Sequence, residues 1–216
     1  MPNPAPRLGR PRDSQIDRAV LVAARELLTE SGYTRVTMDA TAARAGVGKA
    51  AIYRRFASKA ELLFAAAVHG MDIEPPPDSG SLRGDLYAMA RLIHERLSSP
   101  AAREVIPALL AEMSRDAGLA DRLQSTFVAR ERRDLALIVE RARQRGELRR
   151  APESALVHLL LGGPLFLAPL VLTHPMDSAQ LDAIASVVAA GLIAHTDEPS
   201  PETATEETST AETSTD

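Results

Sequence analysis

The chain of 216 residues contains no cysteine and no tryptophan, and aromatic residues make up 3% of it. Without cysteine, disulfide bonds and thiolate metal sites are excluded, which is typical of proteins in a reducing cytoplasm. With so few aromatic rings, a ligand cage of stacked rings is not expected. The opening residues, Met-Pro-Asn-Pro-Ala-Pro, have no apolar stretch of the kind that secretory signals carry. We therefore expect a cytoplasmic protein of one or two domains.

Sequence motifs of enzymes and metal sites are also missing. The five histidines form no H-x-x-x-H or H-E-x-x-H pair, and there is no nucleophile elbow. Gly48-Lys49 has the glycine–lysine pair of a nucleotide-binding P-loop, but a P-loop needs Gly in place of Ala43 and Ser or Thr in place of Ala50. We therefore expect no enzymatic activity, no catalytic residue, no metal ion and no cofactor.

Positive charge is concentrated at one end of the chain. Residues 1–70 hold 11 Lys+Arg against 6 Asp+Glu, residues 71–196 hold 14 against 16, and residues 197–216 hold none against 7. The net charge of −4 argues against nucleic-acid binding, but a basic end is the pattern expected when only that end touches a polyanion. A basic face that is merely solvated would have the same composition, so charge alone does not decide.

The N-terminal third is predicted to be helical after a flexible, proline-rich basic arm at residues 1–12. Capping boxes at Ser14 and Ser58 each precede apolar residues at helical spacing. Glycines mark the ends of the first two helices. The expected helices are 14–31 before Gly32, 37–45 before Gly46, 47–56, and a fourth from 58; together they give a domain at 13–72.

A proline-rich break at 72–80 precedes a second helical region at 81–196. The expected helices there are 82–97, 101–116, 119–146, 152–172 and a last one capped at Asp177. The apolar run 155–172 is long enough to raise the question of a membrane span, but its internal Gly and Pro residues favour a buried helix, and no membrane partner is expected. Residues 197–216 are expected to form a disordered acidic tail.

A helix, a glycine turn and a short basic helix form a helix-turn-helix pattern at 37–56. The second helix of such a motif enters the major groove with its N-terminal residues. Small residues there allow close approach to DNA, and Lys49 can donate to guanine O6 or N7. The aromatic and arginine residues after it can reach phosphates, as can the lysine that opens the next helix. The predicted DNA contacts are Thr37, Gly48, Lys49, Ala50, Ala51, Tyr53, Arg54, Arg55 and Lys59.

Several of these residues also have simpler interpretations. Tyr53 and Phe56 can be core aromatics, which we expect for Phe56. One of Arg54 and Arg55 is expected to be a solvated side chain. The arginines of the arm can enter a minor groove or belong to a leader without function.

The segment Thr37–Leu63 reads TMDATAARAGVGKAAIYRRFASKAELL and follows Glu30-Ser31-Gly32-Tyr33. Both stretches resemble the DNA-binding signature of the TetR family of transcriptional regulators, which covers residues 14–70. The resemblance implies an all-α protein with an N-terminal three-helix DNA-binding domain and a C-terminal helical domain for ligand binding and dimerisation. It also implies a repressor that a small molecule releases from a palindromic DNA operator. A DNA-binding protein that acts constitutively, without an effector, is the alternative.

Two positions depart from that family's usual residues. Thr41 stands where a large aliphatic residue usually packs on the first helix, and its hydroxyl either caps its own helix or weakens the core. Ala51 stands where Ser or Thr commonly binds phosphate, and Arg54 and Arg55 are expected to compensate for the missing hydroxyl.

The resemblance further implies that the C-terminal helices hold a largely apolar effector. The candidate pocket residues are Met89, Ile93, Leu109, Met113, Phe127 and Phe166, with His94 and His158 as polar points. Each can instead be an ordinary core or surface residue. The apolar stretch at 159–172, paired with Ala185, Ala189 and Gly191 of the last helix, is predicted to form a homodimer bundle; otherwise it is an internal helix of one protomer.

Overall fold

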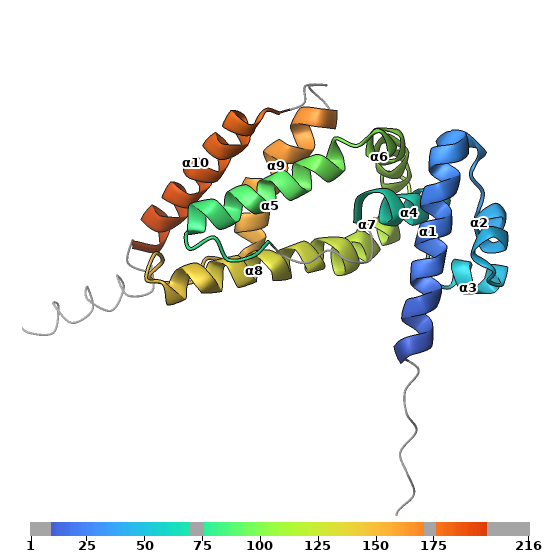
Figure 1. Cartoon of the computed structure of the whole chain (residues 1–216), viewed down its shortest axis with the longest axis horizontal. Helices are drawn as coiled ribbons and strands as arrows, with labels where there is room; N and C mark the ends of the chain where they lie inside the picture. Colours follow the sequence, from blue (N-terminus) through green and yellow to red (C-terminus); the bar gives the residue numbers. More distant parts are fainter. Residues whose placement is uncertain (1–9, 70–75, 171–175, 198–216) are drawn as a thin grey trace, which may run out of the picture. The chain divides into compact units, whose positions relative to one another are not determined.

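The structure is a computed structural model that describes residues 10–69, 76–170 and 176–197 (Figure 1). These residues form helices and no strand, which confirms the all-α prediction. The chain divides into two compact units, Met1–Glu74 with Glu95–Val128 and Pro75–His94 with Ala129–Asp216. We call them the first and the second unit. Residues 95–128, predicted to belong to the C-terminal domain, are therefore grouped with the N-terminal helices.

The first unit is built around the long helix α1. Its elements are α1 (Arg10–Arg35), α2 (Met38–Ala45), α3 (Lys49–Tyr53), α4 (Lys59–Phe64), the π-helical turn η1 (Ala65–His69), α6 (Pro100–Met113), α7 (Ala117–Leu123) and the π-helical turn η2 (Gln124–Val128). Helices α2 and α4 both pack on α1, and α6 packs on α4 and α1. Val105 of α6 is buried in the same core as Val20 of α1 and Leu63 of α4. This shared core explains why α6 is grouped with the N-terminal helices.

Helix α1 begins earlier than its predicted capping box. It starts at Arg10, so Ser14 lies inside the helix, and residues 10–12 are helical rather than part of an arm; residues 1–9 lie outside the described residues. The predicted end of this helix at Gly32 corresponds to a kink inside α1: Gly32 has φ 74° and ψ 167° and interrupts the helical geometry, and a last helical turn follows up to Arg35. A positive φ of this kind is accessible to glycine at little steric cost.

The short-range capping signals are formed as predicted. Thr37 Oγ accepts a hydrogen bond from the backbone N–H of Ala40 at 3.0 Å and caps α2. Ser58 Oγ accepts from the N–H of Glu61 at 3.1 Å, and the Glu61 carboxylate reaches back to the N–H of Ala57 at 2.7 Å. These bonds satisfy N–H groups that have no partner within the helix.

Helix α3 is shorter than the predicted span 47–56. It begins at Lys49 after Gly48 and ends at Tyr53, because the chain tightens there: Arg55 N–H donates to the carbonyl of Ile52 at 2.8 Å. Three-residue bonds of this type close the last turn of a helix more tightly than the α-helical pattern does.

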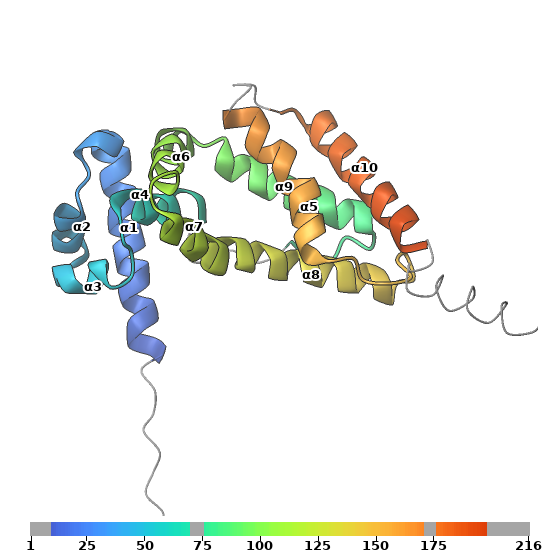
Figure 2. The same cartoon turned by 180° about the vertical axis from the view of Figure 1, so that it is seen from behind.

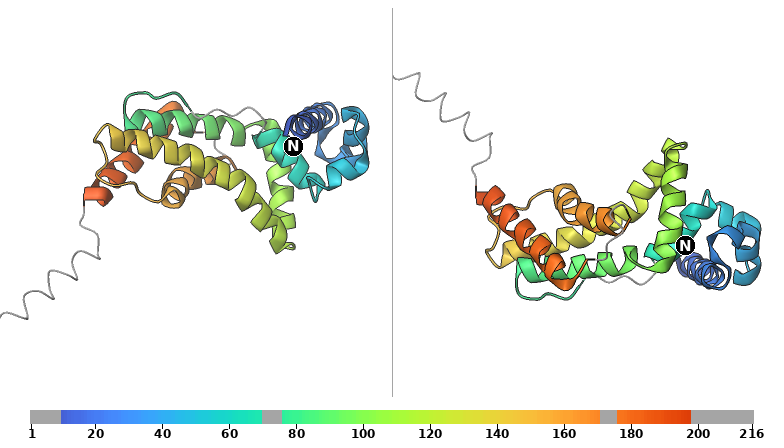
Figure 3. Two further views of the ribbon diagram at one scale, coloured as in Figure 1. Left: turned by 90° about the horizontal axis from the view of Figure 1, so that it is seen from below. Right: turned by 90° about the horizontal axis from the view of Figure 1, so that it is seen from above.

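The second unit holds α5 (Leu82–Leu97), α8 (Ala129–Gln144), α9 (Ser154–Leu170) and α10 (Ser178–Asp197). Only the part of α5 up to His94 is assigned to this unit. Figures 2 and 3 show α9 beside both α8 and α10, in agreement with their contacts. The predicted cap of α10 is formed, with Asp177 accepting from Gln180 N–H at 2.8 Å and Gln180 accepting from Asp177 N–H at 3.0 Å. Helix α10 includes Asp197, the first residue of the predicted tail, and 198–216 lie outside the described residues.

Three helix predictions in the C-terminal region differ from the structure. The predicted helix 119–146 is divided into α7, η2 and α8, because the π-helical turn at Gln124–Val128 breaks the regular hydrogen-bond pattern. The predicted helix 101–116 is α6, which starts at Pro100 behind the cap Ser99. The predicted helix 152–172 is α9, which starts at Ser154 rather than Pro152; residues 171–172 lie outside the described residues.

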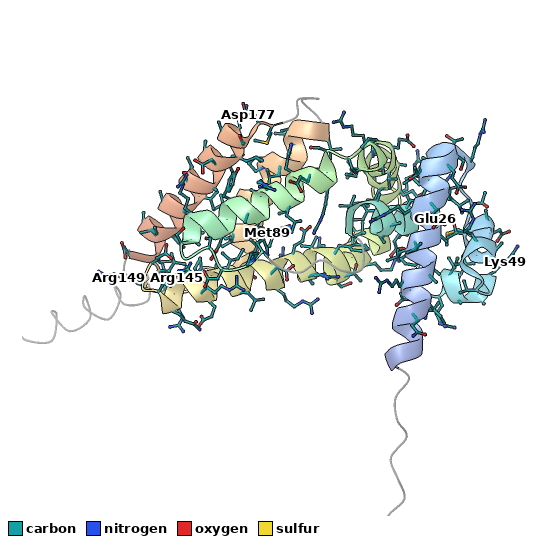
Figure 4. All side chains as sticks on the ribbon, viewed as in Figure 1. Glu26, Lys49, Met89, Arg145, Arg149 and Asp177 are labelled. Carbon is teal, nitrogen blue, oxygen red and sulfur yellow. The ribbon has the colours of Figure 1, made fainter. Side chains whose placement is uncertain are left out.

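An arginine cluster ties the segment before α5 to the end of α8. Arg145 forms ion pairs with Asp78 at 2.7 Å, with the buried Asp85 at 3.2 Å and with Glu147 at 2.7 Å. Glu147 in turn accepts from the backbone N–H of Leu82 at 2.9 Å, the first residue of α5. Figure 4 shows Arg145 at this end of α8. The cluster fixes the start of α5 within the second unit.

We predict that Gly46→Ala destabilises the fold whereas Gly48→Ala does not. Gly46 closes α2 with φ 66°, a left-handed conformation that costs an L-residue about 1–2 kcal/mol. Gly48 has φ −70° and ψ 145°, and an added Cβ there meets nothing within 4 Å. Urea unfolding of both variants should show a loss of about 1–2 kcal/mol for Gly46→Ala only. Equal losses would contradict this assignment of the turn.

Candidate nucleic-acid interface

The position of α3 is set by one buried side chain. Ile52 is fully buried in the core of the first unit, together with Ala24 of α1 and Ala42 of α2. A helix of five residues is too short to be stable by itself in water. The burial of Ile52 therefore holds α3 in one orientation against α1 and α2.

The opposite side of α3 is exposed and carries most of the predicted DNA contacts. Gly48, Lys49, Ala50 and Arg54 are exposed, and Tyr53 is 55% exposed, so it is no core aromatic. Ala51 is half-buried. Figure 4 shows Lys49 on the side of α2 and α3 that faces away from α1. The small residues at 48 and 50 leave the backbone at the start of α3 accessible to a ligand.

Lys49 has a carboxylate partner in the neighbouring helix. Its Nζ lies 2.5 Å from Oδ2 of Asp39, in the first turn of α2. This hydrogen bond and the charge of Asp39 raise the pKa of Lys49 above its ordinary value, so the ammonium is fully protonated at neutral pH. Both side chains are exposed to water, at 66% for Lys49 and 53% for Asp39.

The two arginines that follow α3 have different surroundings. Arg55 is 13% exposed, forms an ion pair with Asp17 of α1 and donates to the carbonyl of Ala51 at 3.0 Å. Arg54 is exposed and has no carboxylate partner among the described residues. Of the two predicted phosphate contacts, Arg54 is available in the free protein, whereas Arg55 holds α3 to α1.

Lys59 also has intramolecular partners. Its Nζ donates to the carbonyl of Tyr33 at 2.9 Å and lies 4.3 Å from the centre of the Tyr33 ring, a cation–π distance. The N–H of Tyr33 donates to Glu104 of α6 at 3.0 Å. Burial and the nearby charge of Glu112 raise the pKa of the Tyr33 phenol. Lys59 therefore links α4 to the end of α1 in the free protein.

The hydroxyl of Thr41 has a backbone partner, which decides between its two interpretations. Thr41 is fully buried and donates to the carbonyl of Thr37 at 2.9 Å, one turn earlier in α2. A buried hydroxyl with a partner avoids most of the cost of desolvation. Thr41 thus bonds to its own helix and leaves no unsatisfied group in the core, while Thr37 remains exposed at the start of α2.

The eight predicted pocket residues are divided between the two units. In the first unit, Leu109 is buried with Ala60 of α4, and Met113 and Phe127 pack on the same cluster. The ring of Phe127 meets that of Phe64, also in α4, edge to face, with centres 5.3 Å apart.

The other five pocket candidates lie in the second unit. Met89, Ile93 and His94 are buried there, and Phe166 is 36% exposed. His158 is half-buried, and its Nε2 lies 2.9 Å from Oε2 of Glu131.

Sequence reasoning missed the acidic partners of this surface. Arg44 of α2 forms a bidentate pair with Glu30 of α1, at 2.8 and 2.9 Å, and a longer contact with Glu26 at 3.4 Å. Arg44 holds the pKa of Glu30 below its ordinary value through this hydrogen bond. Counting net charge by segment concealed these pairs. The placement of Asp39 and Lys49 at the starts of the two helices of the motif was the signal that could have revealed one of these pairs.

The geometry defines a helix-turn-helix DNA-binding protein, and comparison with known proteins identifies its family. Residues 20–66 match the family model described as "Bacterial regulatory proteins, tetR family", and residues 76–188 match "Tetracyclin repressor-like, C-terminal domain". The chain belongs to the TetR family of transcriptional regulators, which bind DNA and are not enzymes.

Two relatives support this assignment. An HTH-type transcriptional regulator of Mycobacterium tuberculosis (strain ATCC 25618 / H37Rv) is 36% identical over 175 residues, which cover 81% of this chain and 84% of that protein. The DNA-binding transcriptional repressor TetR of Mycobacteroides abscessus is 33% identical over 159 residues, covering 68% of this chain and 83% of that protein.

Among solved structures, a TetR family transcription regulator aligns with a TM-score of 0.68 at 26% identity, covering 82% of this chain and 98% of its own. This alignment confirms the architecture of an N-terminal helix-turn-helix followed by a C-terminal helical region.

We predict that Arg54→Ala and Arg55→Ala, which each remove one positive charge, affect different properties of the protein. Arg55→Ala should lower the free energy of unfolding by about 1 kcal/mol, because it removes the ion pair with Asp17 and the hydrogen bond to the carbonyl of Ala51. Arg54→Ala should change stability by less than about 0.5 kcal/mol. It should also make the slope of log affinity against log salt concentration shallower by about 0.9, as expected when one phosphate contact is lost. Chemical denaturation and binding titrations at several salt concentrations measure both effects; a stable Arg55→Ala variant would contradict them.

Proposed function

We propose that this protein is a cytoplasmic repressor that binds a palindromic DNA operator as a homodimer and is released from it by a small molecule. The observation that carries the proposal is the fixed orientation of α3, with Ile52 in the core and Lys49, Tyr53 and Arg54 exposed on the other side. The relative from M. abscessus is a transcriptional repressor, and this supports repression rather than activation as the role of the present protein.

In the proposed complex α3 lies in the major groove and its N-terminal residues face the bases. Gly48 and Ala50 allow close approach, and Lys49 donates to guanine. Tyr53 and Arg54 bind phosphates, as does the exposed N-terminal end of α2 at Thr37. Arg55 and Lys59 act mainly by holding α3 and α4 in place, since both already have partners within the first unit.

A second copy is proposed to cover the outer faces of α9 and α10. Leu159 of α9 is 67% exposed and Val187 of α10 is 72% exposed, which supports an outer position for both helices in the protomer rather than an internal one for α9. Of the three α10 residues predicted for this contact, Ala185 and Ala189 are buried within the protomer and are not available to a partner, whereas Gly191 is exposed. The exposed stripe of α10 instead consists of Ala183, Val187, Ala190 and Ala194.

This stripe also bears on the question of a membrane. Among the described residues, α10 is the one helix long and apolar enough, by length and composition alone, to cross a membrane. A core or interface helix of a protein outside the membrane passes the same test. We propose the interface because stripes of small residues suit close helix packing in a bundle of two copies.

We predict that Val187→Glu separates the homodimer. A charge buried without a partner costs about 3–5 kcal/mol, so the dissociation constant of the dimer should rise at least about 100-fold. Leu137→Glu is the matched control, because Leu137 is 49% exposed on α8 of the same unit. Sedimentation analysis should find monomers for Val187→Glu and dimers for the control. A dimeric Val187→Glu variant would exclude this stripe as the interface.

The effector is proposed to act through side chains that touch α4. Met113 and Phe127 pack on a cluster that includes Ala60 and Phe64 of that helix. A ligand that displaces these two side chains would disturb α4, the helix that follows the helix-turn-helix at 37–56, which we call the reading motif. Met89, Ile93, His94, His158 and Phe166 remain candidates for further ligand contacts in the second unit. The constitutive alternative has no such ligand.

We predict a reciprocal coupling between effector and operator. Compounds that stabilise the full-length protein are first found by thermal shift, since a ligand of the native state raises its melting temperature. A true effector that weakens operator binding tenfold must lose affinity tenfold in the operator complex, a coupling of about 1.4 kcal/mol. Calorimetric titration of the free and operator-bound protein measures this directly. Stabilising compounds with equal affinity in both titrations would favour the constitutive alternative.

A further inference from the structure

The basic residues of the reading motif are mostly neutralised within the protein. Arg44 pairs with Glu30 and Glu26, Lys49 with Asp39, and Arg55 with Asp17. The pairs of Arg44 and Arg55 join α2 and the end of α3 to α1, so they have a structural role. The pair of Lys49 and Asp39 joins the starts of α3 and α2 and lies on the exposed side of the motif.

The pair changes what kind of acceptor Lys49 binds well. An ammonium group has three donors, and the contact with Asp39 Oδ2 at 2.5 Å occupies one of them. The two that remain match the two major-groove acceptors of guanine, O6 and N7. A phosphate oxygen, in contrast, meets the negative charge of Asp39 together with the positive charge of Lys49, and repulsion cancels much of the attraction.

The pair also fixes the position of a flexible side chain before DNA arrives. Lysine has a long stem with many rotamers, and immobilising such a side chain on binding costs conformational entropy. Part of this ordering is already present in the free protein, because Asp39 holds the ammonium at the start of α3.

We propose that Asp39 is a specificity-determining residue of the interface, which directs Lys49 toward guanine and away from phosphate. The proposal rests on the proposed function, in which α3 reads the operator. Asp39 positions Lys49 and weakens binding to DNA of arbitrary sequence, while the pair stays intact in the operator complex. This role rests on the geometry of the pair on an exposed surface, and it makes Asp39 a positioning residue for Lys49.

The test compares Asp39→Asn with the wild-type full-length protein. An operator is first enriched from random duplexes by the wild-type protein. Affinities are then measured for this operator and for an unrelated duplex of equal length, at several salt concentrations. For the variant, affinity for the unrelated duplex should rise about two- to fivefold, the range expected for one exposed ion pair. Its logarithmic salt slope should steepen by about 0.9, as for one added phosphate contact. Affinity for the operator should rise by a smaller factor, so the ratio of operator affinity to unrelated-duplex affinity falls.

Two control variants separate this role from a general loss of negative charge. Glu30→Gln removes one negative charge beside the same motif, but Glu30 pairs with Arg44 and not with Lys49. This variant should therefore change the affinities for both duplexes by the same factor. In a Lys49→Ala background, Asp39→Asn should no longer change the ratio of the two affinities. Circular dichroism of each variant establishes that the helices are retained.

An unchanged or higher ratio for Asp39→Asn would overturn the proposal, because it would mean that Lys49 leaves Asp39 when it binds the operator. An equal fall in the Lys49→Ala background would also overturn it, since Asp39 would then act without Lys49. If the wild-type protein enriches no sequence at all, the proposed function fails and this inference fails with it. An enriched operator with an unchanged ratio removes only the role of Asp39.

Discussion

The burial of Ile52 is the contact on which the candidate interface depends. A five-residue helix gains too few internal hydrogen bonds to offset the entropy of ordering it, so α3 exists because the core holds it. The residues of α3 that face DNA in the proposed complex are positioned by this contact. The Asp17–Arg55 pair then fixes the end of the same helix to α1, and the Ser58 cap starts the next helix a few residues later.

The features that sequence predicted well are the local ones. Thr37, Ser58 and Asp177 cap their helices as expected, because a capping bond joins residues two or three positions apart. The break at Gly32 was also predictable, since glycine readily adopts a positive φ. The family was recognisable for the same reason: its signature is a set of local caps, turns and core positions within one short segment.

The features that sequence missed join distant residues or depend on packing. Arg55 meets Asp17, 38 positions earlier, and Lys59 meets the carbonyl of Tyr33, 26 positions earlier. Neither pairing leaves a periodic pattern. The burial of Ala185 and the division of the pocket candidates between the two units depend on which apolar faces meet. The DNA contacts and the effector pocket remain predictions.

The turn and the reading surface place unequal demands on evolution. The left-handed backbone conformation restricts position 46 to glycine, and the surrounding core restricts position 52 to a side chain like that of Ile52. Gly48 and Ala50 are exposed, and Gly48 has an ordinary backbone conformation with space for a Cβ atom. Selection can therefore alter the exposed positions one at a time without first repairing the fold. In the proposed complex, substitutions at 48, 49 and 50 would therefore change the preferred operator while the scaffold beneath them stays the same, so gene duplication followed by such changes would yield regulators of different genes.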